Sequence, residues 1–185
     1  MKQHMKILLL LWLLITAITS HAASIDRVVL WGNTYYGMSL KEVQLAFPTV
    51  QIKPDNTGTL NLKSNDRVLA KLDMLEIAGR NFNVWFIFNN DQLSHVTLTL
   101  APNVNPIAEL STGEEINKLY EHYAELLTAK YGNPINKTWQ EYAPLNIRLW
   151  NTQWIKGLTN VELNVDKTQL KIIYGAEYAE DLKKL

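Results

Sequence analysis

The sequence contains no cysteine. Disulfide bonds, thiolate metal sites, cysteine nucleophiles and a lipidated N-terminal cysteine are therefore excluded. A chain of 185 residues is long enough to be held together by a hydrophobic core without cross-links. Small secreted eukaryotic domains are usually rich in disulfides, so for an exported protein the absence favours a bacterial envelope.

The chain also lacks an excess of charge of either sign. Its 18 lysines and arginines balance 18 aspartates and glutamates, and removing residues 1–22 leaves 16 basic against 18 acidic residues. This balance gives no reason to expect nucleic acid or an anionic membrane surface as a partner. A hydrophobic content of 47% with 19% charged residues is typical of a globular domain.

Only one long apolar run is present, and it lies at the N-terminus. The run Ile7–Ile18 follows two lysines and precedes Ser20 and Ala22, two small residues at the spacing that a signal peptidase recognises. Its length of about a dozen residues is short of the roughly 20 that span a bilayer. We therefore expect a signal peptide over residues 1–22, cleaved after Ala22. The exported chain would be periplasmic or secreted, with no stable membrane anchor after cleavage.

Two segments have the pattern of capped amphipathic helices. Ser39 and Glu42 form a capping-box sequence at the start of Leu40–Phe47, and Pro48 ends that segment. A longer helix is expected from a cap at Ser111 or Thr112 to Gly132. Its apolar residues recur at helical spacing and are Ile116, Leu119, Tyr120, Tyr123, Leu127 and Tyr131.

Alternating apolar residues predict strands in both halves of the chain. The clearest are Asn81–Asn89, Ser94–Leu100, Leu145–Ile155, Val161–Val165 and Gln169–Tyr174. Residues 86–93 align with residues 163–170, and in each half a helix ended by a proline comes first. The pattern predicts one α+β globular domain over residues 23–185, made of two tandem repeats at about 31–103 and 111–176. Each repeat is a helix followed by an antiparallel meander, giving one antiparallel sheet with two helices on one face. The alternative to a repeat is that the two hairpins look alike only because both have apolar strands.

This arrangement resembles the superfamily of β-lactamase-inhibitor-like domains, which includes the SmpA/OmlA-type envelope lipoproteins. The helix opening over residues 36–43, YGMSLKEV, is similar to the G-x-[ST]-x-x-x-V phrase of these proteins, and residues 131–134, YGNP, are similar to their helix-ending G-x-P. The resemblance implies a tandem-repeat envelope protein. The chain departs from the lipoproteins by lacking the cysteine that would carry a lipid, and no functional residue carries over.

Motifs of catalysis are absent from the sequence. His95 and His122 lie on different predicted elements, and neither belongs to a metal-binding spacing. There is no G-x-S-x-G elbow or Ser-x-x-Lys motif. The acidic pairs at 114–115 and 180–181 are adjacent in sequence, whereas a glycosidase needs two carboxylates across a cleft. We expect no catalytic residues, no metal and no cofactor.

A row of tryptophans is the most distinctive feature of the mature sequence. In the strand Leu145–Ile155 one face is apolar, and the other alternates tryptophan with arginine and threonine. A sheet covered by one helix layer needs only one apolar face, so the second face has the composition of a protein-interaction hot spot. The predicted binding residues are Arg148, Trp150, Thr152, Trp154, Trp85, His95, Trp139 and Tyr142. The alternative is that a loop, a terminus or the other repeat covers this face.

The sequence thus predicts an exported, non-enzymatic binding protein that acts on a protein partner through an aromatic sheet face. The candidate partners are a secreted hydrolase or toxin, bound by an inhibitor or immunity protein, or an envelope-assembly component. Tryptophans also stack on sugar rings, which leaves a carbohydrate or small-ligand binding protein, or a cell-wall hydrolase, as the alternative. A third option is a structural domain whose tryptophans belong to the core.

The leader prediction is tested by intact mass measurement of the chain recovered from the envelope of a bacterial host. The mature protein should begin at Ala23. An Ala22→Asp substitution should block cleavage because it places a charge at a position where the peptidase requires a small residue, whereas His21→Asp should be processed normally. A protein that retains residues 1–22 in the wild type would contradict the prediction.

Overall fold

A computed structural model of the chain describes residues 27–52, 60, 62–101, 113–142, 147–166 and 169–177. The predicted leader and the expected capping residues Ser111 and Thr112 lie outside the described residues. Tyr142, Ile147 and Arg148 are described by their backbone alone. None of the helices within these ranges combines the length and hydrophobicity that a membrane-spanning helix requires.

The described part of the chain contains two helices and eight strands, which the figures label α2, α3 and β1 to β8. The helices are α2 (Leu40–Ala46) and α3 (Gly113–Tyr131). The strands of the first half are β1 (Gln51–Ile52), β2 (Asp66–Ile77), β3 (Arg80–Asn89) and β4 (Gln92–Leu100). Those of the second half are β5 (Asn136–Tyr142), β6 (Ile147–Lys156), β7 (Thr159–Val165) and β8 (Leu170–Ala176).

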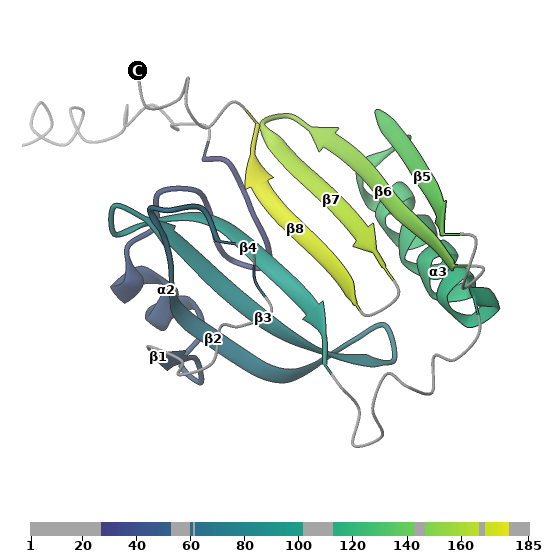
Figure 1. Ribbon diagram of the computed structural model, residues 1–185. Helices are drawn as coiled ribbons and strands as arrows, with labels where there is room; N and C mark the ends of the chain where they lie inside the picture. The colour runs from purple at the N-terminus through teal and green to yellow at the C-terminus, as the bar shows by residue number, and fades with distance from the viewer. Residues whose placement is uncertain are drawn as a thin grey trace, which may run out of the picture.

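The strands form one antiparallel sheet in the order β1-β2-β3-β4-β8-β7-β6-β5 (Figure 1). Each half of the chain runs helix, then four strands, and the last strands of the halves pair in the middle of the sheet, with Val96 opposite Tyr174. The predicted α+β class with one antiparallel sheet is confirmed. The five predicted strands correspond to β3, β4, β6, β7 and β8, whereas β2 was not predicted.

The start of α2 and the end of α3 have causes that are visible in the sequence. At α2, Ser39 Oγ accepts a hydrogen bond from the Glu42 amide at 3.3 Å, and the Glu42 carboxylate accepts one from the Ser39 amide at 2.8 Å. At the end of α3, Gly132 has a φ of +90°, which favours glycine, and its amide donates to the Thr128 carbonyl at 2.9 Å.

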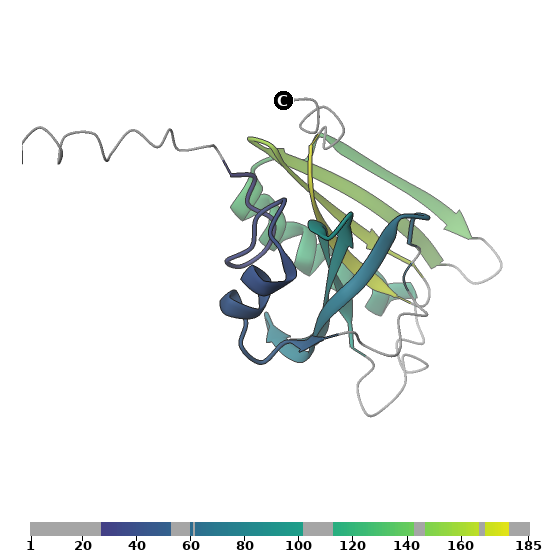
Figure 2. The same ribbon diagram turned by 90° about the vertical axis from the view of Figure 1, so that its left-hand side faces the viewer.

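The core lies between the two helices and one face of the sheet. Phe47, just after α2, contacts Phe86 with ring centroids 5.4 Å apart, and Tyr123 of α3 meets Phe82 edge-on at the same distance. Phe82 and Phe86 point to the same side of β3 because residues two apart share a face. The predicted placement of both helices on one face is therefore confirmed, as the rotated view of Figure 2 also shows.

The face of β6 that carries the tryptophans is the face that α3 covers. Trp154 is fully buried, and its indole N–H donates to Thr128 Oγ1 at 3.3 Å. Thr152 is also buried and hydrogen-bonds the hydroxyl of Tyr120 at 2.8 Å. The expectation that Trp150, Thr152 and Trp154 form a bare binding surface is therefore wrong: α3 supplies both apolar cover and hydrogen-bond partners to this row.

The buried position of Trp154 has a measurable consequence. Trp154→Ala removes a fully buried indole and should lower the free energy of unfolding by about 3–5 kcal/mol, measured by denaturant titration. The control is Trp139→Ala, since the Trp139 side chain is 52% exposed and should contribute much less to stability. Equal losses at the two positions would contradict this assignment of the faces.

Candidate functional site

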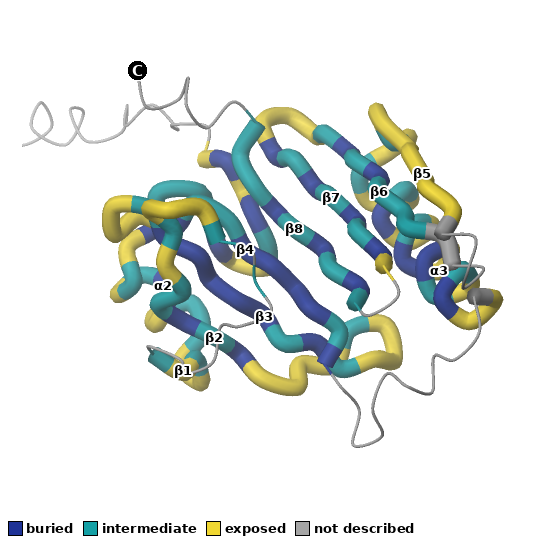
Figure 3. The backbone as a smooth tube through the Cα atoms, viewed as in Figure 1, coloured by how far each residue is buried: buried dark blue, intermediate teal, exposed yellow. Residues whose placement is uncertain are grey.

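The two helices leave the opposite face of the sheet without helical cover in the described part of the chain. On β6, β7 and β8 the side chains of that face are mostly polar and partly exposed, as the alternating colours along these strands show (Figure 3). We call this surface the polar face, and it comprises Asn151, Gln153, Asn160, Glu162, Asn164, Lys171 and Ile173. On the same side of β3 and β4, Trp85, Ile87, Thr97 and Thr99 are buried, so the accessible part of this side is the part over β6 to β8.

Side-chain amides on the polar face are linked across the strands. Asn151 Nδ2 donates to Asn164 Oδ1 at 2.5 Å, and Gln153 Nε2 donates to Asn160 Oδ1 at 3.0 Å. Asn160 Nδ2 in turn lies 3.4 Å from a carboxylate oxygen of Glu162. Each carboxamide has two donor hydrogens and an oxygen with two lone pairs, so these bonds orient the groups without using all their capacity. The network is therefore a preorganised set of hydrogen-bonding groups.

A shallow groove of about 440 Å³ lies over β5, β6 and β7 at one end of this surface. Its lining residues include Thr138, Gln140, Leu149, Asn151, Asn164 and Asp166. Thr138 Oγ1 donates to the Asn151 carbonyl at 3.4 Å, which ties the outermost strand to the amide network. Trp139, Trp150, Leu149 and Val165 also line the groove, so it combines amide, hydroxyl and carboxylate groups with apolar and aromatic surface, as protein interfaces do.

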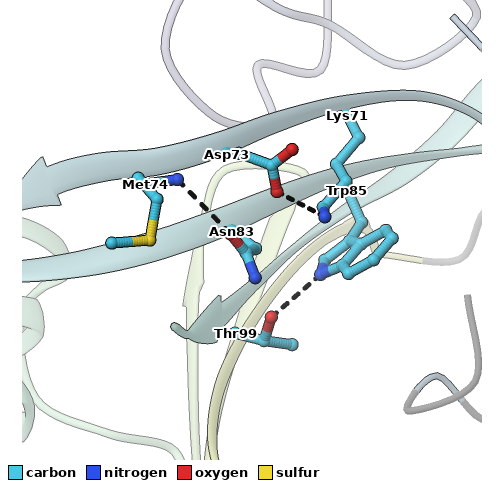
Figure 4. A network of polar contacts seen from close by, with 6 residues as sticks. All are labelled: Lys71, Asp73, Met74, Asn83, Trp85 and Thr99. Carbon is cyan, nitrogen blue, oxygen red and sulfur yellow. Dashed lines mark hydrogen bonds and ion pairs between the residues drawn. The ribbon is translucent and has the colours of Figure 1, made fainter. Parts of the chain in front are cut away.

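Trp85 points to the same side of the sheet as the polar face but is only 4% exposed. Its indole N–H donates to Thr99 Oγ1 at 2.8 Å, and the Lys71 ammonium lies 4.4 Å above the ring (Figure 4). Lys71 is also ion-paired with Asp73 on the same strand. Trp85 is consequently closed to an external ligand, and its predicted role as an exposed binding residue is wrong.

His95 lies on β4, opposite Ile87 of β3 and Gly175 of β8. Its Nδ1 is 2.9 Å from the hydroxyl of Ser94. Burial lowers the pKa of His95, while the charges of Asp66 and Lys63 act in opposite directions, Asp66 raising it and Lys63 lowering it. Its environment favours the neutral imidazole, which suits a structural residue.

Among the predicted binding residues whose side chains are described, Trp139 is the most exposed, at 52%. It lies on β5 opposite Trp150, and the centroids of the two rings are 6.1 Å apart. Trp150, partly buried, stacks in turn on Tyr120 of α3. The ammonium of Lys137 lies 5.3 Å from the Trp150 ring and 5.4 Å from the Tyr120 ring. These residues form an aromatic cluster that continues from beneath α3 to the edge of the sheet.

The eight predicted binding residues therefore do not form one surface. Trp150, Thr152 and Trp154 lie on the α3 side of β6, Trp85 and His95 lie on the opposite side, and Trp139 lies at the edge. The side chains of Arg148 and Tyr142 lie outside the described part of the chain. The polar residues missed by the prediction alternate in the sequence at 151 and 153, and at 160, 162 and 164, which is the period of a half-exposed strand.

The described residues contain no group of three or more histidine, aspartate or glutamate side chains placed to hold a metal ion. In the same residues, each buried side-chain nitrogen or oxygen has a hydrogen-bond partner. The described polar face therefore offers hydrogen bonding by neutral amides together with the charged groups of Glu162 and Lys171.

Comparisons with known proteins found no similarity on which a family could be assigned. No family model matches the chain. No curated protein matches it. No solved structure matches its fold.

The lowered pKa of His95 predicts a pH dependence of stability. Because the unfolded chain takes up a proton on this imidazole more readily than the folded chain does, stability should fall as the pH drops below about 6.5. The free energy of unfolding of the wild type should therefore decrease more between pH 7 and pH 5 than that of His95→Gln. His122→Gln, on the exposed side of α3, controls for the loss of a histidine; identical pH profiles for wild type and His95→Gln would refute the prediction.

Proposed function

We propose that the chain is exported by its N-terminal segment and acts in the periplasm, or outside the cell, as a non-enzymatic protein that binds another protein. The observation that carries this proposal is the polar face: an ordered, partly exposed set of amide side chains on the side of the sheet opposite both helices. An inhibitor, an immunity protein and an envelope-assembly component all require such a surface without a catalytic site.

The shape and chemistry of the polar face favour a protein over a small ligand. Small-ligand sites are concave and bury most of their ligand, whereas the groove over β5 to β7 is shallow and continues into a broad sheet surface. Protein interfaces are similarly broad and carry about one hydrogen bond for each 100–200 Å². The oriented amides of Asn151, Gln153 and Asn164 suit that kind of contact.

The carbohydrate alternative is less well supported by the same residues. Sugar recognition by stacking needs an exposed aromatic ring beside hydrogen-bonding groups. Trp85 on the polar side is buried beneath Lys71. Trp139 and Trp150 reach the groove from the α3 side of β5 and β6, so they line it without lying across the polar face as a stacking platform. We therefore retain glycan binding as an outcome to be tested, and not as the proposal.

We further propose that the two halves are tandem copies of one repeat. The support is their common order, a helix followed by four strands, and the hairpins β3–β4 and β7–β8 that contain the aligned segments 86–93 and 163–170. A repeat of this kind is what the resemblance to the β-lactamase-inhibitor-like domains implies. The resemblance would then extend to binding of a protein partner.

The binding proposal is tested by placing a large charged residue in the groove. Asn164→Arg should weaken binding by at least about tenfold, roughly 1.4 kcal/mol, to a partner captured from envelope extract, identified and then purified. Leu45→Arg is the control, since Leu45 is 72% exposed on α2, away from the polar face. Unchanged affinity for the Asn164 variant would exclude the groove, and glycan-array binding abolished by the same variant would favour the carbohydrate alternative.

A further inference from the structure

The two ends of the sheet differ in how they meet solvent. At one end β1 has only two residues and pairs with Ala70 and Lys71 alone, and β2 beside it is interrupted by two register shifts, which make its edge a poor template for another strand. At the other end β5 has seven residues, and its side chains from Asn136 to Glu141 are all exposed (Figure 3). Edge strands in soluble proteins are usually short, bulged or covered, because they are templates for pairing with another chain. Within the described residues β5 is the last strand of the sheet and is long enough to act as such a template.

The sequence of β5 is self-complementary around Trp139. Lys137, Trp139 and Glu141 share one face of the strand because they are two residues apart. If two copies of β5 pair antiparallel with Trp139 opposite Trp139, then Lys137 of each copy lies opposite Glu141 of the other. On the second face, Thr138 then lies opposite Gln140. Each lysine therefore faces a glutamate of the other copy, and the two Trp139 rings meet at the centre.

We propose that the occupant of the β5 edge is a second copy of this chain, paired antiparallel about a two-fold axis at Trp139. The interface is isologous, as in most soluble dimers, so every contact away from the axis occurs twice. Backbone hydrogen bonds between the two β5 strands join the sheets, and the charge pairs select the register. This surface is the edge of the sheet, so the proposal does not depend on a partner at the polar face.

Two of the β5 side chains that this pairing would use are ordered by contacts within the chain. Trp139 is 52% exposed, yet its ring lies 6.1 Å from that of Trp150, which fixes it against the aromatic cluster. Lys137 is held near the rings of Trp150 and Tyr120, at 5.3 and 5.4 Å. The ring of a second Trp139 extends this cluster across the two-fold axis, where a cross-strand aromatic pair stabilises the contact.

Charges on an edge strand also serve to prevent pairing. Protection of that kind does not depend on the sign of the charges, and it gives no reason for a lysine and a glutamate at equal distances on either side of a tryptophan. The balanced pair instead favours one register of self-pairing. The two explanations predict opposite results when the charges are exchanged.

The test is a charge exchange, with the dimer dissociation constant measured by sedimentation equilibrium. The sample is the protein expressed as the full sequence in a bacterial host and purified in the form in which the host processes it. Lys137→Glu and Glu141→Lys should each weaken the dimer at least about tenfold, because each places like charges opposite one another. The double variant should return the dissociation constant to within about threefold of wild type. Lys41→Glu, an exposed site on α2, is the matched control, and circular dichroism confirms that each variant is folded.

A second measurement uses the absence of native cysteine. Trp139→Cys should form an intermolecular disulfide on mild oxidation, because the two residues face each other at the axis. Glu141→Cys should not, since two copies of this residue lie about 14 Å apart along the paired strands. Lys137→Cys combined with Glu141→Cys should restore the cross-link.

The outcomes separate the proposal from its alternatives. A dimer that is lost in the single charge variants and restored in the double variant, with cross-linking at position 139, supports pairing in this register. A wild type that stays monomeric at several hundred micromolar overturns the proposal and supports a protective role for the charges. A dimer unaffected by the single variants, or a double variant that stays monomeric, also overturns it.

Discussion

The stacking of Tyr120 on Trp150 fixes the position of α3 and thereby decides which face of the sheet is open. The two rings are nearly parallel, with centroids 4.3 Å apart and planes at 5°, and the Tyr120 hydroxyl hydrogen-bonds Thr152 at 2.8 Å. Asn117 and Thr128 of the helix accept hydrogen bonds from the indoles of Trp150 and Trp154. Because each buried side-chain nitrogen or oxygen among the described residues has a partner, the two tryptophans are stable under the helix, and the proposed binding surfaces are the other face and the edge of the sheet.

The same helix also ties the two halves of the chain together. Tyr123 contacts Phe82 of β3, and its hydroxyl donates to the carbonyl of Ile77 at the end of β2 at 3.0 Å. The halves are further joined by the pairing of β4 with β8 in the middle of the sheet. One continuous sheet with a single helical layer follows, and it leaves the amide-lined polar face and the exposed strand β5 for contact with other molecules. A dimer through β5 would bring the grooves of two copies toward a common axis without covering the polar faces.

Much of the fold was predictable, because local signals decide it. Three features have a local physical cause that the sequence shows. They are the capping at Ser39, the left-handed turn at Gly132, and the alternation of apolar residues in β3, β4 and β7. The faces of β6 were assigned wrongly because apolar residues occur on both, and alternation alone does not identify the covered side. The covered face of β6 is identified only by its hydrogen-bond partners on α3. These are Asn117, 33 residues before Trp150, and Thr128, 26 residues before Trp154. A bulge between Leu93 and His95 also shifts the register, so that Val96 and Ile173, equivalent in the repeat alignment, point to opposite faces.

The central claim is that α3 buries Trp154 of β6, whereas Trp139 at the edge of the sheet is the most exposed tryptophan in the described part of the chain. Hydroxyl-radical footprinting of the native protein, with each modified residue located by mass spectrometry, tests it directly. Trp139, at 52% exposure, should be oxidised rapidly, whereas Trp154, with no exposed surface, should be protected until the protein unfolds. Oxidation of Trp154 in the folded protein at a rate similar to that of Trp139 would contradict the account.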